Sequence, residues 1–294
     1  MEKRTTFNSW TIGICFAVPQ LLLIFTFFYW PAGQAVWWSL TLQQPWGGGN
    51  SWVGLDNFRA ILSSTEYWNS IIRSTVFAAF STGIAMSVGL LLAALTDRQL
   101  RGSKFYRVVL VWPYGIAAPS LGLAFRFILA PEAGIMATVN QWWPGFWDPG
   151  LNGVEAMASV IAAFSWKYIG YNFIFFLAAF QGIPRSLIEA ASMDGSGVLR
   201  RFKDIQMPLV MPTIFFLLVI NITESFQDSF GIVDIMTSGG PANSTNLMVY
   251  KIYFDGFRGL DYSGAAAQSI ILMMLIVILT IVQFRFIERR VHYN

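Results

Sequence analysis

Six apolar segments, separated by short polar connections, limit what this chain can fold into. They cover approximately residues 12–30, 75–95, 107–130, 155–180, 213–235 and 264–286. A helix rises about 1.5 Å per residue, so a segment of about 20 residues crosses the ~30 Å hydrocarbon core of a bilayer. Inside that core every backbone polar group needs a partner within the chain, and a helix provides one for each. The pattern therefore predicts an all-α integral membrane protein with about six transmembrane helices.

The composition agrees with a membrane protein and argues against soluble classes. Of the 294 residues, 55% are hydrophobic and 12% are charged, whereas a soluble domain carries about 25% charged residues. The net charge of +3 could indicate a nucleic-acid partner. The basic residues instead form short clusters between the apolar segments, as membrane topology requires. We expect a lipid environment, no nucleic-acid partner, and a single transmembrane domain over residues 1–294, because no connection could hold a separate domain.

The distribution of Lys and Arg predicts the orientation of the chain. If the N-terminus lies inside, most basic residues fall in inner connections and few in outer ones. Basic residues are enriched on the cytoplasmic side, so both termini are predicted to be cytoplasmic. Lys3 and Arg4 precede the first apolar segment as they would in a signal peptide. This segment is long and lacks a good cleavage site, so we expect it to be retained as an anchor.

The connection between the fourth and fifth apolar segments is short, charged and rich in Gly. Ser186 is followed three residues later by Glu189, which is the capping-box pattern at the start of a helix, and Gly195 is a typical helix end. A helix of about two turns is unstable alone in water, so it should need a partner surface. Pro208 and Pro212 are predicted to break the chain before the fifth segment.

This connection, residues 183–212, resembles the EAA loop of ABC-importer permeases. The resemblance lies in Glu189, Ala190, Ala191, Asp194, Gly195, Phe202, Ile205, Pro208 and Pro212 at the spacing of that motif. Residues 28–58 and 237–257 are similar to the carbohydrate-uptake type of these permeases. Within that type the likeness is strongest to permeases for glycerol-3-phosphate, and residues 171–173, 183–191 and 250–253 carry it.

The resemblance implies a transport subunit of the bacterial inner membrane, not an enzyme. Its partners would be a second permease in a heterodimer, two copies of a cytoplasmic ATPase, and an extracytoplasmic solute-binding protein. The short helix between spans four and five would be a cytoplasmic coupling helix, in which Glu189, Ala190, Ala191, Asp194 and Gly195 dock on the ATPase. ATP would bind to that ATPase, because this chain has no Gly-rich loop ending in Gly-Lys-Ser/Thr. We expect no cofactor and no metal in the chain itself.

Polar residues within the apolar segments are candidates for the substrate pathway, because ionisable groups are costly at membrane depth. Lys167 lies mid-way along the fourth segment with Tyr171 and Asn172 nearby. We consider two roles for Lys167: attraction of a phosphate-bearing solute, or a buried ion pair. The fifth segment carries a stripe spaced three and four residues apart, consisting of Asn221, Glu224 and Asp228. These residues could bind sugar-alcohol hydroxyls, or pair with Lys167 or with the second permease.

Two other functions were considered. The same fold could import a neutral sugar or oligosaccharide. A membrane enzyme is the more remote alternative, since it would need catalytic acids, bases or metal ligands clustered at one interface. A single histidine, His292, a single cysteine, Cys15, and scattered carboxylates do not supply such a cluster.

Overall fold

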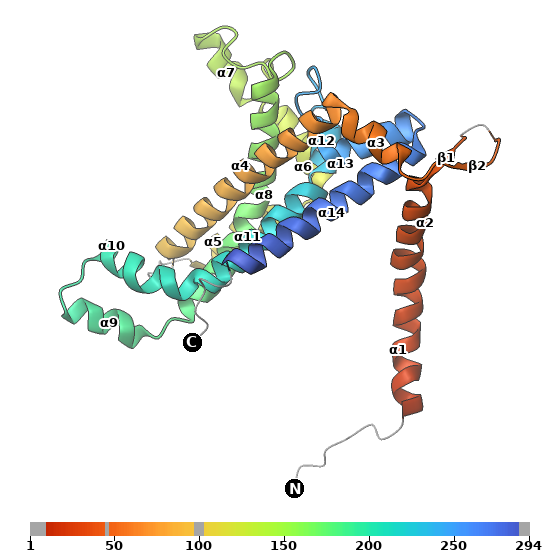
Figure 1. Ribbon diagram of the computed structural model, residues 1–294. Coiled ribbons are helices and arrows are strands. Elements are labelled where there is room, and N and C mark those ends of the chain that lie inside the picture. The colour runs from red at the N-terminus through yellow and green to blue at the C-terminus, as the bar shows by residue number, and fades with distance from the viewer. Residues whose placement is uncertain (1–9, 45–46, 97–102, 288–294) are drawn as a thin grey trace. The chain divides into compact units, whose positions relative to one another are not determined.

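The computed structural model describes residues 10–44, 47–96 and 103–287. The chain is helical apart from one small hairpin and its connecting loops (Figure 1). It divides into two compact units, Met1–Ser64 with Ile252–Ile271, and Thr65–Lys251 with Leu272–Asn294. The prediction that residues 1–294 form a single domain stays a prediction. So does the cytoplasmic position of the termini, because residues 1–9 and 288–294 lie outside the described residues.

The first unit begins with one long helix. It is built from α1 (Trp10–Ile24), a π-helical turn (Phe25–Tyr29) and α2 (Trp30–Ser39). The predicted end of the first span at residue 30 is wrong, because the helix continues nine residues further. Pro31 lies in the first turn of α2, directly after the π-helical turn, where its missing N–H is tolerated. This helix presents apolar side chains to its surroundings along its whole length.

A hairpin and a short helix complete the start of the first unit. Strands β1 (Thr41–Gln43) and β2 (Asn50–Trp52) pair antiparallel, and α3 (Asp56–Ser63) follows. The Asn57 side chain of α3 donates to the carbonyls of Ser39 and Thr41, at 2.9 and 3.1 Å. Asn57 thereby fixes the end of α2 against the hairpin.

The second unit contains the remaining helices. They are α4 (Thr65–Thr96), α5 (Ser103–Val111), a 3₁₀ turn (Trp112–Gly115), α6 (Ala118–Ile128), α7 (Ile135–Trp142), α8 (Gly153–Gln181), α9 (Arg185–Met193), α10 (Val198–Arg201), a π turn (Phe202–Gln206), α11 (Met207–Gln227) and α12 (Phe230–Met236). Helix α13 (Met248–Tyr253) begins in the second unit and ends in the first. After a π turn (Phe254–Arg258), α14 (Tyr262–Ile287) passes from the first unit into the second.

The membrane-spanning character of the chain is confirmed. In the described ranges, five helices are long and apolar enough to cross a membrane, or six if the bent pair α5–α6 counts as one span. The predicted second span, 75–95, is too short, because α4 begins at Thr65. The fourth and sixth spans agree with α8 and α14 to within two residues.

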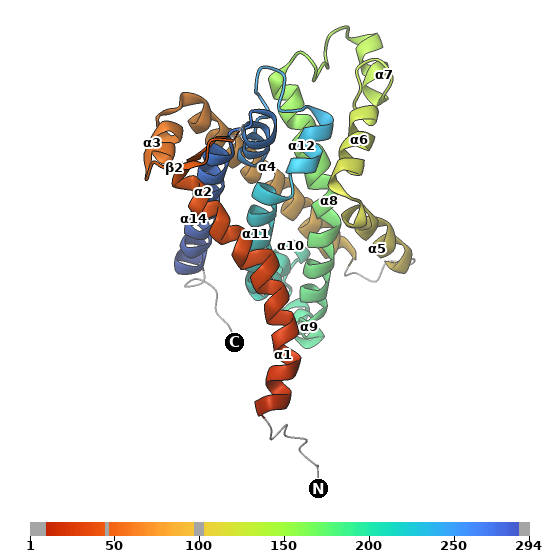
Figure 2. The same ribbon diagram turned by 90° about the vertical axis from the view of Figure 1, so that its right-hand side faces the viewer.

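The third span is broken in its middle. Residues 107–115 and 118–128 form two helices bent by 109°, which Figure 2 shows at α5 and α6. Pro113 lies in the 3₁₀ turn and Pro119 in the first turn of α6. Each ring removes a backbone donor, so the helix cannot continue through this region. A non-helical turn at membrane depth is tolerated only where protein or a polar cavity surrounds it.

The fifth span differs from its prediction at both ends. A continuous helix runs from Val198 to Gln227, and the chain then bends into the separate helix α12. Pro208 and Pro212 therefore do not break the chain before this span. Pro208 follows the π turn, whose wider backbone spacing accommodates a ring, and Pro212 is tolerated inside α11 as prolines are in membrane helices.

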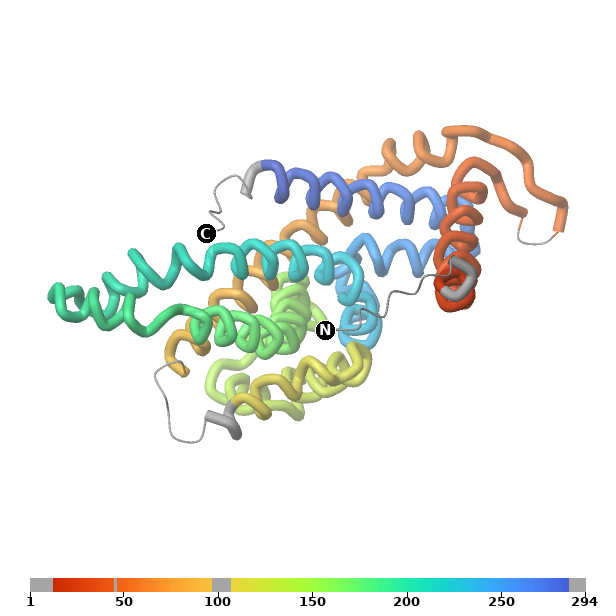
Figure 3. The backbone as a smooth tube through the Cα atoms, turned by 90° about the horizontal axis from the view of Figure 1, so that it is seen from below, coloured from red at the N-terminus to blue at the C-terminus, as the bar shows by residue number. Residues whose placement is uncertain are grey.

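The core of the second unit lies where α4, α8 and α11 meet. Figure 3 shows α8 in green beside α11 in cyan. Small residues allow the close approach: an added Cβ at Gly89 of α4 would lie 3.1 Å from the backbone nitrogen of Phe173 in α8. Near this contact lies a cluster of buried apolar residues, which consists of Ala93, Phe173, Phe176, Leu177, Phe180, Val210 and Leu217.

Gly170 is the position where the packing leaves least room. An added Cβ there would lie 1.8 Å from the Leu110 carbonyl oxygen of α5, a backbone atom that cannot turn aside. We expect Gly170→Ala to destabilise the protein by about 1–3 kcal/mol, as overpacking does. The melting temperature of the purified protein in detergent measures the effect.

Gly83→Ala is the matched control, because, apart from the backbone of its own helix, no atom of the described residues lies within 4 Å of its added Cβ. It should leave the melting temperature unchanged. Equal melting temperatures for the Gly170 and Gly83 variants would contradict the packing of α5 against α8 described above.

Candidate functional site

Helix α9 lies at one end of the second unit, opposite the end that carries α7 (Figure 1). A three-residue link joins it to α8, and residues 194–197 join it to α10. The structure thus contains the short helix predicted between spans four and five. Its side chains are mostly exposed, including Glu189, Ala190 and Asp194. The apolar side chain of Met193 is 89% exposed, so α9 presents a surface suited to a partner.

The predicted capping box at the start of α9 is wrong. The N-cap is Pro184, and no side chain of the described residues caps the helix. The Pro184 carbonyl accepts the first bond, from the Leu187 N–H at 3.1 Å, which puts Ser186 inside the helix. The Glu189 carboxylate is therefore not used in capping and remains available on the surface.

The predicted end of α9 at Gly195 is confirmed. Gly195 has a φ of +75°, in the left-handed region that glycine adopts most readily. The Ser196 N–H donates to the Ala191 carbonyl and the Gly195 N–H to the Ser192 carbonyl, at 3.0 and 3.1 Å. This pair of bonds is the Schellman motif, so Ala191 and Gly195 have defined roles in ending the helix.

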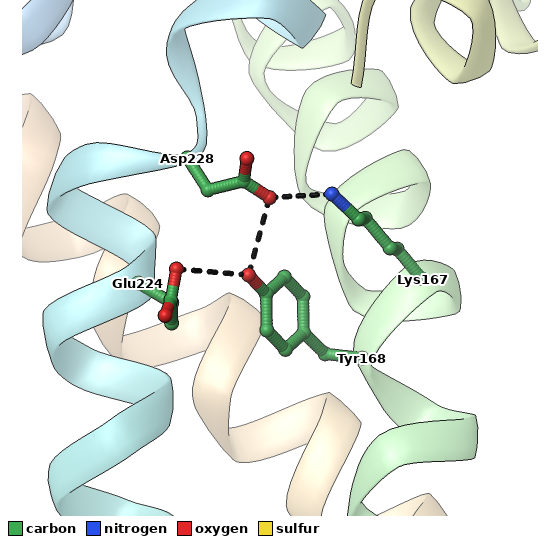
Figure 4. A network of polar contacts seen from close by, with 4 residues as sticks. All are labelled: Lys167, Tyr168, Glu224 and Asp228. Carbon is green, nitrogen blue, oxygen red and sulfur yellow. Dashed lines mark hydrogen bonds and ion pairs between the residues drawn. The ribbon is translucent and has the colours of Figure 1, made fainter. Parts of the chain in front are cut away.

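A second group of polar residues joins α8 to α11 at membrane depth (Figure 4). The Lys167 ammonium of α8 lies 2.5 Å from a carboxylate oxygen of Asp228. The Tyr168 hydroxyl lies 3.1 Å from the same oxygen and 3.2 Å from Glu224. Lys167 is only 7% exposed, as expected for a cation whose partner is supplied by the protein. Of the two roles considered for Lys167, the structure contains the buried ion pair.

Asn172 and Asn221 form a second link between the same helices. Each amide donates to the other's oxygen, at 2.9 and 2.7 Å, and each also donates to a carbonyl of its own helix. Both side chains are fully buried. Since each amide is satisfied within the protein, both residues join α8 to α11 in this structure. Their direct contact with a solute stays a prediction.

Tyr171 belongs to an aromatic group that includes a residue absent from the predicted site. Its ring stacks on Tyr114 with centroids 4.9 Å apart, and Tyr114 also meets Tyr168 edge-on at 5.7 Å. Tyr114 comes from the 3₁₀ turn of the broken third span and is 40% exposed. The sequence signal that could have identified it is Pro113-Tyr114-Gly115, a helix-breaking triplet inside an apolar segment.

The group therefore combines a paired ammonium, two carboxylates and one exposed tyrosine ring, that of Tyr114. It offers hydrogen-bond acceptors and flat apolar surfaces to a solute. Searched over the described residues, the chain shows no group of three His, Cys, Asp or Glu side chains able to hold a metal ion.

Comparison with known proteins identifies the family. The sequence profile described as "Binding-protein-dependent transport system inner membrane component" matches residues 85–293. The chain is 45% identical over 292 residues to the "sn-glycerol-3-phosphate transport system permease protein UgpA" of Rhizobium meliloti (strain 1021), covering 99% of this chain and 100% of the relative. It is 42% identical over 293 residues to the protein of the same name from Escherichia coli O157:H7, covering 100% and 99%.

Solved structures show the same fold. A bacterial ABC transporter that imports the acidic polysaccharide alginate matches with a TM-score of 0.81 at 20% identity, over 95% of each chain. The same score is reached, at 19% identity and 96% coverage, by an alginate transporter in complex with an alginate pentasaccharide-bound periplasmic protein. On its profile match and its full-length relatives, this chain is a multi-pass transporter subunit, not an enzyme, and belongs to the family of inner membrane components of binding-protein-dependent transport systems.

Proposed function

We propose that this chain forms part of the translocation pathway for sn-glycerol-3-phosphate in an ATP-driven importer. The main support for this substrate is the 45% identity, over nearly the whole length of both chains, to a permease named for this solute. The polar group at α8 and α11, beside the exposed ring of Tyr114, is the membrane-depth site that such a small polar solute would contact.

The proposed assembly contains a second permease, two copies of a cytoplasmic ATPase and a solute-binding protein. Membership of a binding-protein-dependent family supports the last partner. The exposed helix α9, too short to be stable alone, supports a cytoplasmic partner. The apolar surface of α1 and α2 supports contact with lipid and with a second membrane subunit.

The connections of α9 suggest how ATPase movement would reach the solute. Residues 194–197 join α9 to a continuous 30-residue helix, Val198–Gln227, which begins with α10 and is about 45 Å long. The far end of that helix carries Glu224 and leads directly to Asp228. On the other side, a three-residue link joins α9 to α8, which carries Lys167. A displacement of α9 would thus act on both helices of the polar group through short connections.

Import of a neutral sugar is the alternative that a competition experiment tests. We expect proteoliposomes containing the complete importer to take up labelled sn-glycerol-3-phosphate when ATP is present. Unlabelled glycerol-3-phosphate should compete with the labelled solute. A large excess of maltose should not, because a site selected for a phosphate ester binds a neutral disaccharide weakly. Uptake of labelled maltose together with absent phosphate-ester uptake would replace this function with the alternative.

Glu189 tests the coupling role of α9. The carboxylate caps nothing, so Glu189→Gln should leave the amount and the melting temperature of the protein unchanged. If it contacts the ATPase, we expect the substitution to lower transport at least tenfold, as the loss of a charge-assisted hydrogen bond does. Uptake and substrate-stimulated ATP hydrolysis are the measurements.

The control is Glu132→Gln, which neutralises an exposed carboxylate in the α6–α7 connection, remote from α9. It should transport like the unaltered importer. Full transport by the Glu189 variant would show that this charge takes no part in coupling.

A further inference from the structure

The polar group at α8 and α11 has an excess of negative charge. Within the described residues, its hydrogen bonds and ion pairs join one ammonium, Lys167, to the carboxylate of Asp228, and bring in a second carboxylate, Glu224, through Tyr168. Glu224 has no ion pair with a described residue. An unbalanced carboxylate is costly at membrane depth, so positive charge or hydrogen-bond donors supplied from outside this chain would be favoured there.

Tyr168 cannot satisfy both carboxylates. Its hydroxyl has a single proton, yet it lies 3.1 Å from Asp228 and 3.2 Å from Glu224. The two acceptors therefore share one donor. The Asp228 side chain is 33% exposed and Glu224 is half-buried, so both keep lone pairs that a solute could reach.

The same geometry disfavours a phosphate at Lys167. To bind the anion, Lys167 would have to leave Asp228, from which it is separated by 2.5 Å. Two uncompensated carboxylates would then lie close to a doubly charged phosphate, and like charges repel strongly in a medium of low dielectric constant. Hydroxyl groups have the opposite preference, because they donate to carboxylates without adding charge.

The rings beside the carboxylates suit the carbon skeleton of a polyol. Tyr114 is stacked on Tyr171 and lies edge-on to Tyr168, the ring whose hydroxyl contacts both carboxylates, and Tyr114 itself is 40% exposed. Aromatic faces provide flat apolar area next to polar atoms. A solute with hydroxyls at one end and C–H groups along its chain can use both at once.

Resting on the proposed function, we propose that this chain binds the hydroxyl-bearing end of the substrate through Glu224 and Asp228 beside Tyr114, and that a cation of the second permease binds the phosphate. The substrate site is then divided between the two permeases: this chain binds the hydroxyls and the second permease binds the phosphate. Each permease alone would hold an incomplete site.

The first experiment compares two phosphate esters, sn-glycerol-3-phosphate and propyl phosphate, a deoxy ester that has the same carbon chain without the two hydroxyls. Both are supplied to the complete importer in proteoliposomes at concentrations that saturate the solute-binding protein. For Glu224→Ala we expect transport of glycerol-3-phosphate to fall about 10- to 100-fold, as loss of a hydrogen bond to a charged group does. Transport of propyl phosphate, which has no hydroxyl for Glu224 to bind, should change less than about twofold.

Thr223→Val is the matched control on the same helix. The Thr223 hydroxyl already donates to the Val219 carbonyl of α11 at 2.9 Å, so its removal should alter neither rate. Equal losses for both esters in the Glu224 variant would overturn the inference, because a merely structural carboxylate does not distinguish the two substrates.

The second experiment asks what Lys167 does. If it only neutralises Asp228, the double variant Lys167→Met with Asp228→Asn should transport glycerol-3-phosphate at least tenfold faster than Lys167→Met alone. This follows because the double variant leaves no unpaired carboxylate at position 228, while the amide oxygen of the new asparagine can still accept from the solute hydroxyl. A double variant as slow as the single one would assign the phosphate to Lys167 and overturn the inference.

The unaltered importer distinguishes failure of the proposed function from failure of the divided substrate site. If it fails to take up glycerol-3-phosphate, the proposed function fails and the inference fails with it. If uptake is normal but both esters are equally affected by Glu224→Ala, only the inference fails.

Discussion

The paired polar side chains between α8 and α11 are the interaction on which the second unit depends. In a membrane, water cannot satisfy a buried amide or charge, so a polar side chain must find its partner on a neighbouring helix. The Lys167–Asp228 ion pair and the reciprocal Asn172–Asn221 bonds meet this demand about one and a half to two turns apart. They fix the register and the rotation of the two helices, which apolar contacts alone leave nearly free.

Fixed register matters because both helices lead to α9. A short link follows α8, and residues 194–197 join α9 to a continuous helix that ends beside Asp228. Rigid elements joined by short connections transmit a displacement, whereas long loops absorb it. The Schellman motif at Gly195 gives α9 a defined end. Glu189 has no capping role, so its carboxylate stays available for contact with a partner, as a docking helix requires.

The sequence predicted the parts of this protein that depend on local composition. Apolar length located the membrane-spanning segments, and the residues around Glu189–Gly195 identified the family that the profile and the relatives confirm. It was less successful where the outcome depends on helix rotation. Hydropathy gives the depth of Lys167 but not the direction in which it points, so its pairing with Asp228 stayed one of two alternatives. Tyr114 was missed because a break in an apolar segment does not change its mean hydropathy.

The charge of the polar group also bears on which second permease can assemble with this chain. A group with two carboxylates and one ammonium is favoured at membrane depth by added positive charge or donors. On the proposed division of the site, the hydroxyls of the solute supply donors to the carboxylates, and the cation that binds the phosphate comes from the second permease. A permease lacking that cation would leave the phosphate unbound and would not complete the site. Substrate recognition would then limit which second permease can serve with this chain.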